Sequence, residues 1–312
     1  MSSILVVGSL NTDISICVER LPLRGETVLG SGYSYTFGGK GANQAYAARL
    51  AGADVTMLGS VGQDKYGEQI IQKLQEAGIH TECLRREVQR PTGTAFVMTD
   101  REGVNSITVI SGANAACDTE YVRSCQTQFA AANCVLLQLE IPLEAVCSCA
   151  ALAKNMGKLV VLNPAPAIAE LPQELYENVD ILTPNETELE QLSGCRTETY
   201  EDLILAARRL VEKGIPRVIV TLGSRGALLV EREDAVLIPG RRVQPLDSTG
   251  AGDCFNGVLT VALADGLPAR EAIVRANVAA SISVTRWGAM LSMPNKSEID
   301  AACNSGDWNG GA

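Results

Sequence analysis

The sequence predicts an α/β fold of three layers, in which helices cover both faces of a mostly parallel, doubly wound central sheet, with residues 1–312 as one domain. Short and almost wholly apolar runs alternate with helical stretches for most of the chain. The expected strands are residues 4–7, 55–58, 135–139, 159–162, 181–182 and 218–221. Apolar runs of this length are typical of parallel strands that are covered on both faces.

The clearest predicted helices lie between these strands. Thr199 is expected to cap a helix over residues 200–213, with Asp202 completing a near capping box and Gly214 ending the helix. A second helix is predicted over residues 250–264. The alternation of strands and helices indicates right-handed βαβ units.

Two segments break this alternation. Residues 14–36 and 93–112 contain short predicted strands without helices between them. We expect them to pair into a small accessory sheet that acts as a lid beside a ligand site. Residues 304–312 are rich in Gly and Asn and are expected to form a frayed tail.

Composition limits the classes of partner. The 26 Lys and Arg residues against 36 Asp and Glu give a formal net charge of −10, which argues against binding to nucleic acid or to an anionic membrane. A nucleotide is compatible with this charge, because local donors and a metal can hold phosphates in an acidic protein. Apolar runs are strand-sized and the first residues read as a strand, so we expect a cytoplasmic protein.

Ten cysteines are scattered through the predicted strands and helices. In a cytoplasmic chain of this size, we expect free thiols that pack as small apolar side chains. The single histidine, His80, has no evident metal-binding partners in the sequence, so a zinc site is not expected.

Polar residues gather where the predicted strands end. In open parallel sheets, ligands bind outside the carboxyl ends of the strands. The residues at these positions are Asn11, Asp13, Glu140, Asn163, Asn185, Glu188, Gly223 and Ser224. Each alone is an ordinary turn former, and only their joint placement at one edge of the sheet indicates a binding site.

The strongest candidate site is residues 247–253, which read Asp-Ser-Thr-Gly-Ala-Gly-Asp and precede an apolar helix. Small residues and the free N–H groups of a helix start suit a transferring phosphoryl group, although a capped helix after a flexible turn has the same residues. Asp253 lies where its carboxylate can accept a proton from an attacking hydroxyl group. Near a helix N-terminus its pKa is expected to stay low, so positioning and charge neutralisation should supply most of the catalysis.

A second glycine-rich segment, residues 36–44, reads Thr-Phe-Gly-Gly-Lys-Gly-Ala-Asn-Gln and opens a helix. It lacks the spacing of a Walker A loop. Its glycines, together with Lys40 and Asn43, suit a polyhydroxylated ligand. The alternative is a glycine-rich helix start without a binding role.

Two further segments leave their alternatives open. Asn185 and Glu188 lie three residues apart, which suits oxygen ligands of Mg²⁺ and equally suits a capping box. Residues 221–226 join two predicted strands, and they could wrap nucleotide phosphates or form a hairpin turn.

Taken together, these segments resemble the ribokinase family of carbohydrate kinases, also called the PfkB family, from residue 4 to about residue 294. The motifs that carry the resemblance are residues 8–13 (Gly-Ser-Leu-Asn-Thr-Asp), 38–45 (Gly-Gly-Lys-Gly-Ala-Asn-Gln-Ala), 162–167 (Leu-Asn-Pro-Ala-Pro-Ala), 183–188 (Thr-Pro-Asn-Glu-Thr-Glu) and 247–253. The resemblance implies a ribokinase-like fold and an ATP-dependent sugar kinase that phosphorylates the primary 5-hydroxyl of ribose. Fructose, deoxyribose or a nucleoside stays open as the acceptor.

The resemblance also implies roles for individual residues. Those that match the sugar site are Asn11, Asp13, Gly38, Gly39, Lys40, Asn43, Glu140 and Asp253. Asp253 matches the catalytic base, and the residues that match the anion hole are Gly250, Ala251 and Gly252. Those that match the nucleotide site are Asn185, Thr221, Gly223, Ser224, Gly226 and Asn277.

Ions and a second subunit are implied in the same way. Asn185 and Glu188 match the motif that organises Mg²⁺ and phosphate. The residues that match a monovalent-cation site, occupied by K⁺ in the family, are Asp247, Thr249, Ser283, Arg286, Gly288 and Ser292. Residues 14–36 and 93–112 match the lid, which in the family also forms a homodimer contact.

Three positions modify these expectations. Asn277 stands where family members often carry a histidine near adenine, and Trp287 adds a bulky side chain to the cation loop. Cys254 follows the expected base at a helix start, where the pKa of a thiol tends to fall, so its alkylation is expected to inhibit the enzyme.

Two other function classes share parts of the pattern. A dinucleotide-dependent oxidoreductase would have the same kind of sheet, but its phosphate loop needs G-x-G-x-x-G after the first strand, and residues 8–13 lack those glycines. A non-catalytic sugar-binding protein would keep the pocket and lose the base, whereas Asp253 is present.

Overall fold

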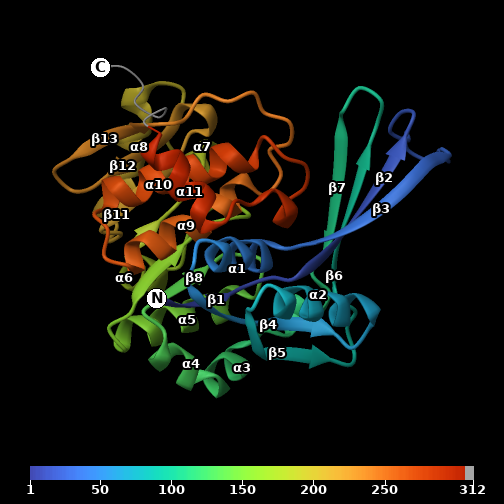
Figure 1. Cartoon of the computed structure of the whole chain (residues 1–312), viewed down its shortest axis with the longest axis horizontal. Coiled ribbons are helices and arrows are strands. Elements are labelled where there is room, and N and C mark those ends of the chain that lie inside the picture. Colours follow the sequence, from blue (N-terminus) through green and yellow to red (C-terminus); the bar gives the residue numbers. More distant parts are fainter. Residues whose placement is uncertain (306–312) are drawn as a thin grey trace.

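The computed structural model describes residues 1–305, and within them a nine-stranded sheet forms the centre of the molecule (Figure 1). Its strand order is β13-β12-β11-β10-β9-β8-β1-β4-β5. The strands are β1 (Ser3–Val7), β4 (Asp54–Gly62), β5 (His80–Glu87), β8 (Cys134–Leu137), β9 (Leu159–Leu162), β10 (Ile181–Leu182), β11 (Arg217–Thr221), β12 (Gly226–Val230) and β13 (Ala235–Pro239). All pairs from β5 to β11 are parallel, and β12 and β13 are added antiparallel at one edge.

Helices cover both faces of this sheet. One layer contains α1 (Lys40–Leu50), α2 (Lys65–Glu76), α9 (Ala251–Ala264), α10 (Ala269–Ser283) and α11 (Lys296–Asn304). The other contains α3 (Thr119–Ser124), α4 (Gln126–Ala131), α5 (Leu143–Asn155), α6 (Gln173–Asn178), α7 (Glu186–Ser193) and α8 (Tyr200–Glu212). Along β1, Ile4 and Val6 pack into the first layer while Leu5 and Val7 pack into the second. This alternation explains why the strands are apolar on both faces, as the sequence predicts.

A second, four-stranded sheet projects from the main body (Figure 1). Its order is β3-β2-β6-β7, with β2 (Asn11–Val18), β3 (Gly30–Gly38), β6 (Gly93–Thr99) and β7 (Asn105–Ile110). These strands come from the two segments that break the alternation of strands and helices, so the predicted accessory sheet is confirmed. Short 3₁₀ helices are η1 (Gly112–Ala116), η2 (Gly223–Arg225) and η3 (Met290–Ser292).

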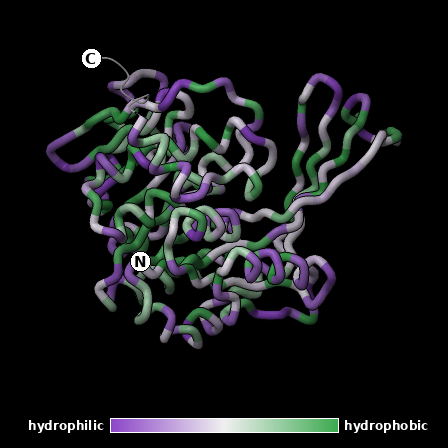
Figure 2. The backbone as a smooth tube through the Cα atoms, viewed as in Figure 1, coloured by the Kyte–Doolittle hydropathy of each residue, from purple (hydrophilic) through white to green (hydrophobic). Residues whose placement is uncertain are grey.

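The two faces of the second sheet differ in chemistry. Successive residues of a strand point to opposite faces, and directly paired residues share a face. Asn11 and Asp13 of β2 therefore lie on one face. The other face carries the apolar residues of β2 and their cross-strand partners, namely Ile14, Ile16, Tyr33, Tyr35, Phe96 and Met98. Figure 2 shows hydrophobic segments along these projecting strands.

The predicted element boundaries agree with the structure to within a few residues. Thr199 and Asp202 form the expected capping box of α8, and Gly214 follows the end of that helix at a φ of 130°. The predicted helix over residues 250–264 is α9, with Gly250 as its N-cap residue. Most of the predicted frayed tail, residues 306–312, lies outside the described residues.

The cysteines form no disulfide within residues 1–305, and six of them are buried. This confirms that they pack mainly as small apolar side chains. Over residues 1–305, the structure has no helix of the length and apolar character that a membrane span requires.

Candidate active site

The predicted site residues meet at the carboxyl edge of the parallel sheet, where the second sheet joins it. Asn11 begins β2 shortly after β1 ends, and Glu140 follows β8. Lys40 opens α1, and Asp253 lies in the first turn of α9. Four segments that are far apart in the sequence therefore supply one site, as expected for an open parallel sheet.

Asp253 is buried and held by two side-chain amides. Nδ2 of Asn43 donates to its Oδ2 at 2.9 Å, and Nε2 of Gln44 donates to its Oδ1 at 3.0 Å. Burial raises the pKa of Asp253, while Lys40 and these two amides act in the opposite direction. The expectation of a low pKa at the helix start was wrong, because loss of water around the carboxylate outweighs the charge of Lys40 and the two amide hydrogen bonds. The raised pKa makes Asp253 a better proton acceptor than an exposed carboxylate.

Asp13 and Glu140 lie near Asp253 and complete a cluster of carboxylates. Burial raises the pKa of Asp13 to about 6, and the charges of Glu140 and Asp253 add to the effect. Glu140 is fixed from two sides, because Ser9 Oγ and the backbone N–H of Lys40 both donate to its Oε2, the latter at 3.2 Å. Such a cluster is rich in acceptors, which suits a ligand with many hydroxyl groups.

Asn11 is oriented by a residue that sequence reasoning missed. Nδ2 of Asn114, in η1, donates to Oδ1 of Asn11 at 2.7 Å, and Oδ1 of Asn114 accepts from the N–H of Leu10 at 2.9 Å. A Cβ at Gly93 would lie 2.2 Å from Oδ1 of Asn11, so only glycine leaves room for this pair. The sequence around Asn114 carried no signal of this role, because the contact spans more than 100 residues.

The glycines before α1 allow a close approach of backbone segments. Gly39 has a φ of 88°, and a Cβ there would lie 2.8 Å from the backbone nitrogen of Asn11. A Cβ at Gly38 would lie 2.4 Å from Oδ2 of Asp13. Both positions therefore require glycine to bring the start of α1 against β2, which places Lys40 beside the carboxylates.

The start of α9 has the geometry expected of an anion site. Gly250 is the N-cap residue with a φ of 75°, and a Cβ there would lie 2.9 Å from Cβ of Ala289. The N–H of Ala251 donates to Ser248, and the first intrahelical bond runs from Cys254 to Gly250. The N–H groups of Gly252 and Asp253 consequently lie at the free end of the helix. A Cβ at Gly252 would meet open space, so a ligand can approach the backbone there.

The segment over residues 221–226 forms the turn between β11 and β12, which pair antiparallel. The segment therefore has the geometry of a hairpin turn, which is compatible with a nucleotide role. Thr221 bridges to Asn185, so two predicted nucleotide residues lie side by side. Gly226 has a φ of 99°, and Gly223 faces open space. Asn277 donates to the carbonyl of Ile238 at 3.2 Å and thereby ties α10 to β13 next to this turn.

Asn185 and Glu188 form a capping box at the start of α7. Oδ1 of Asn185 accepts from the N–H of Glu188, and Oε2 of Glu188 accepts from the N–H of Asn185, both at 2.8 Å. The capping alternative is thus confirmed. Oε1 of Glu188 is left for another partner, and burial raises the pKa of this residue.

Two residues of the implied cation site, Thr249 and Gly288, bond to a third, Asp247. Its Oδ1 accepts from the N–H of Thr249 at 2.9 Å, and its Oδ2 accepts from the N–H of Gly288 at 2.9 Å. Although burial opposes them, these hydrogen bonds lower the pKa of Asp247. Ser283, Ser292 and Arg286 bond to other groups in the structure. Any cation here would therefore be held mainly by backbone carbonyls.

Two expectations about neighbouring side chains need correction. Cys254 is fully buried, and burial raises the pKa of its thiol to about 12, so the expected reactive thiolate is wrong. The thiol points into the core cluster below α9 rather than toward the anion site. Trp287 is 69% exposed, so its bulk faces solvent.

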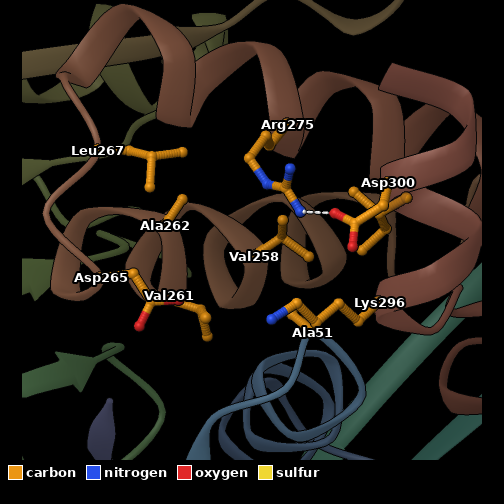
Figure 3. A pocket seen from close by; sticks show the side chains of 10 residues that line it. Ala51, Val258, Val261, Ala262, Asp265, Leu267, Arg275, Lys296 and Asp300 are labelled. Atoms are coloured by element: carbon orange, nitrogen blue, oxygen red, sulfur yellow. Dashed lines mark hydrogen bonds and ion pairs between the residues drawn. The ribbon is translucent and has the colours of Figure 1, made fainter. Parts of the chain in front are cut away.

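A separate pocket of about 210 Å³ lies at the far ends of α1 and α9 from this site. Figure 3 shows its lining side chains, among them the ion pair of Arg275 with Asp300. Its lining includes Ala51, Asp265 and Lys296 but none of the predicted site residues. The candidate active site is therefore defined by the convergent polar residues and not by this pocket.

A family model described as pfkB family carbohydrate kinase matches residues 1–296. The chain belongs to the pfkB family of carbohydrate kinases. The ribokinase of Haemophilus influenzae is 40% identical over 296 residues, which are 95% of this chain and 96% of that protein. The deoxyribokinase of Salmonella typhi is 36% identical over 292 residues, covering 94% of this chain and 95% of that protein.

A solved structure of Arabidopsis thaliana ribokinase in complex with ribose and ATP superposes on this chain with a TM-score of 0.92. The two are 35% identical, and the match covers 96% of this chain and 98% of that one. The ribokinase-like fold predicted from the sequence is thereby confirmed. The pfkB family member described here is a phosphotransferase that acts on a sugar.

The raised pKa of Asp13 predicts how the stability of the free protein depends on pH. The pKa in the folded protein, about 6, lies above 3.8, the ordinary value of an aspartate side chain, so the folded state holds this proton more tightly. The associated stabilisation is present below about pH 4 and is lost as the pH rises through 6. Asp13→Asn should therefore raise the free energy of unfolding by about 2–3 kcal/mol at pH 8, and by clearly less at pH 5.

Urea denaturation of the sugar-free protein at both pH values measures this effect. Glu212→Gln, on the exposed side of α8, makes the same change in net charge and should leave both values within about 0.5 kcal/mol. Equal stabilisation by Asp13→Asn at pH 5 and pH 8 would contradict the assigned pKa.

Proposed function

We propose that this pfkB family member transfers the γ-phosphoryl group of MgATP to the 5-hydroxyl of D-ribose, giving ribose 5-phosphate and ADP. The observation that carries the proposal is the position of Asp253, which lies both beside the carboxylate cluster and in the first turn of α9. The hydroxyl oxygen of the sugar attacks the γ-phosphorus, the bond to the β–γ bridging oxygen breaks, and the hydroxyl proton passes to Asp253.

The sugar would lie between the second sheet and the start of α1. Asn11 and Asp13 reach it from β2, Lys40 and Asn43 from α1, and Glu140 from the segment after β8. We infer that the chain forms one ribokinase-like domain in which the second sheet acts as a lid over the bound sugar. The carboxylate of Asp13 can accept hydrogen bonds from two neighbouring hydroxyl groups, which favours ribose over deoxyribose.

The triphosphate would extend from the start of α9 toward the β11–β12 turn. Gly250, Ala251 and Gly252 would form the anion hole, where the free N–H groups of Gly252 and Asp253 face the transferring phosphoryl group. The turn containing Gly223 and Ser224 would contact the rest of the nucleotide. Glu188 keeps one free carboxylate oxygen, which suits Mg²⁺ bound through water. When bound, Mg²⁺ supplies neutralising charge for the phosphates.

A monovalent cation, K⁺ in our proposal, would bind the loops that Asp247 joins. The hydrogen bond from Gly288 to Asp247 holds residues 286–288 beside residues 247–249, directly before the anion site. A cation at this place would add positive potential to the start of α9. The ten cysteines, six of them buried, suit a reducing compartment, and we place the enzyme in the cytoplasm.

We infer a homodimer that forms through the apolar face of the second sheet. Tyr33 is 77% exposed, and with Ile14 and Ile16 it lines a shallow hollow of about 300 Å³. Tyr35 and Phe96 on the same face are also exposed. A second copy of the chain is the partner, since the same face of both sheets can pack together in a symmetric contact.

An ADP-release assay across D-ribose, 2-deoxy-D-ribose, D-fructose and ribonucleosides tests the acceptor. The value of kcat/KM should be highest with D-ribose, and about 10-fold or more lower with 2-deoxy-D-ribose, because one hydrogen bond to a charged acceptor is lost. The same assay with and without K⁺ tests the cation. A higher kcat/KM with deoxyribose than with ribose would contradict ribose as the acceptor and favour deoxyribose, the sugar named for the Salmonella relative. No ADP release with any of these acceptors would refute the proposed kinase activity.

Asp253→Asn tests the catalytic base. The substitution removes the proton acceptor and keeps the size of the side chain, so turnover should fall by roughly 10² or more while sugar affinity, measured by calorimetry, stays within a few-fold. Asp265→Asn, at the other end of α9, is the matched control and should keep normal turnover. Near-normal turnover in Asp253→Asn would rule out the assigned role.

Tyr33→Asp tests the proposed dimer. A charge at this exposed position does not disturb the core of one subunit, but it would be buried in the contact between two. Light scattering should show a dimer for the unchanged protein and a monomer for the variant. Leu205→Asp, at a 64% exposed position on α8, should remain dimeric. A monomeric unchanged protein at micromolar concentration would exclude the dimer.

A further inference from the structure

Two glutamines form a buried chain of amides behind Asp253. Gln44 lies in α1 and Gln138 directly after β8, and both side chains are fully buried. Nε2 of Gln138 donates to Oε1 of Gln44 at 2.7 Å. Nε2 of Gln44 donates to Oδ1 of Asp253 at 3.0 Å and to Oδ1 of Asn163 at 3.1 Å. All hydrogen-bonding atoms of Gln44 are thus engaged.

These hydrogen bonds have a fixed direction. A glutamine amide has a donating and an accepting end, and a half-turn exchanges them. An ionised carboxylate only accepts, so Gln44 must turn its Nε2 toward Asp253 and its Oε1 toward Gln138. Asn163 supports the same orientation, because its Nδ2 donates to the carbonyl of Thr183 and leaves its Oδ1 to accept from Gln44.

The position of Gln138 has a cost in stability. Its Oε1 is buried and accepts no hydrogen bond from residues 1–305. A Cβ at Gly8 would lie 1.9 Å from this atom, so the amide packs directly on the backbone at the end of β1. An unpaired buried acceptor costs about 1–3 kcal/mol, so stability alone would favour an apolar residue here. Nε2 of Gln138, in contrast, has a partner, because it donates to Gln44 and fixes the orientation of that side chain.

We propose that Gln44 and Gln138 are positioning residues that keep the carboxylate of Asp253 ionised and turned toward the sugar hydroxyl. The inference rests on the proposed role of Asp253 as the base. Burial raises the pKa of Asp253, and the donated hydrogen bond of Gln44 opposes that rise. Asn43 donates to the other oxygen, but it is also a proposed sugar ligand, whereas Gln44 contacts protein groups alone.

The chain of amides also favours the return of Asp253 from its protonated form to the ionised carboxylate after each turnover. Once Asp253 has taken the proton of the sugar hydroxyl, its neutral carboxyl group accepts hydrogen bonds more weakly than the carboxylate does. Gln44 cannot reverse its amide, because its Oε1 is already paired with Gln138. The hydrogen bond from Gln44 therefore stabilises the carboxylate more than the neutral carboxyl group, and it assists loss of the proton before the next turnover.

The test measures kcat and KM for D-ribose from pH 5 to pH 9 in Gln44→Met and Gln138→Met, because Met has a similar length and no amide. Gln44→Met should lower kcat by about 10- to 10²-fold and move the acid limb of the pH profile to higher pH, with KM for ribose within a few-fold. Gln138→Met should move the same limb in the same direction by less. Their effects on kcat should be less than additive in the double variant, because they act through one chain of hydrogen bonds.

Thr260→Val is the matched control. Thr260 is fully buried in α9, and its Oγ1 donates to the carbonyl of Asn256 without contact to the glutamines. Its substitution removes one buried hydrogen bond and should leave the acid limb in place. The charged groups that face Asp253 are Lys40 from α1, Glu140 after β8, Asp13 from β2 and Glu188 from α7, and each variant leaves them unchanged.

An acid limb that stays in place in both glutamine variants would overturn the proposal, even if their melting temperatures fall. If Gln44→Met does not fold, Gln138→Met decides alone, because it leaves both donors to Asp253 present. Suppose that Asp253→Asn loses activity while the acid limb stays in place in both glutamine variants. This result would reject the positioning role of the glutamines and support Asp253 as the base. Normal turnover in Asp253→Asn would reject both.

Discussion

Helices α1 and α9 meet backbone to backbone at Gly257, and the active site depends on this contact. A Cβ at Gly257 would lie 2.6 Å from Cβ of Ala47 and 2.7 Å from the carbonyl oxygen of Gln44. Gly257 lies one helical turn after Asp253, so the close approach places the amides of Asn43 and Gln44 on that carboxylate. A larger residue at position 257 would separate the starts of α1 and α9, and with them the proposed sugar site from the proposed phosphate site.

The contact brings together more negative charge than the protein can compensate by itself. Burial raises the pKa of Asp13 to about 6, and the charges of Glu140 and Asp253 add to this rise. At Asp253 the charge of Lys40 acts in the opposite direction. A neutral ligand with many hydroxyl groups supplies donors to these carboxylates without adding charge. A phosphorylated sugar adds negative charge beside the same residues. If the sugar binds here as proposed, the negative charge of these carboxylates favours binding of the neutral acceptor over retention of the phosphorylated product.

The sequence predicted those parts of the molecule that depend on local patterns. Apolar runs identified the parallel strands, and the spacing of Thr199 and Asp202 identified a helix start, because strand burial and capping involve neighbouring residues. Asn114, Gln44 and Gln138 were not predicted, because their roles arise from contacts across about 100 residues. The same limit explains the error at Cys254, where a helix start suggested a reactive thiol.

The second sheet joins the proposed sugar site to the proposed subunit contact through a single strand. Asp13 and Ile14 are neighbours in β2, so one points to the carboxylate cluster and the other to the apolar face. A shift in the pairing of β2 by one residue would exchange these two sets of side chains. Any partner that packs on Ile14 and Ile16 therefore also fixes the register that presents Asn11 and Asp13. In this fold, the proposed sugar site and the proposed surface for assembly thus depend on the same hydrogen-bonded strand.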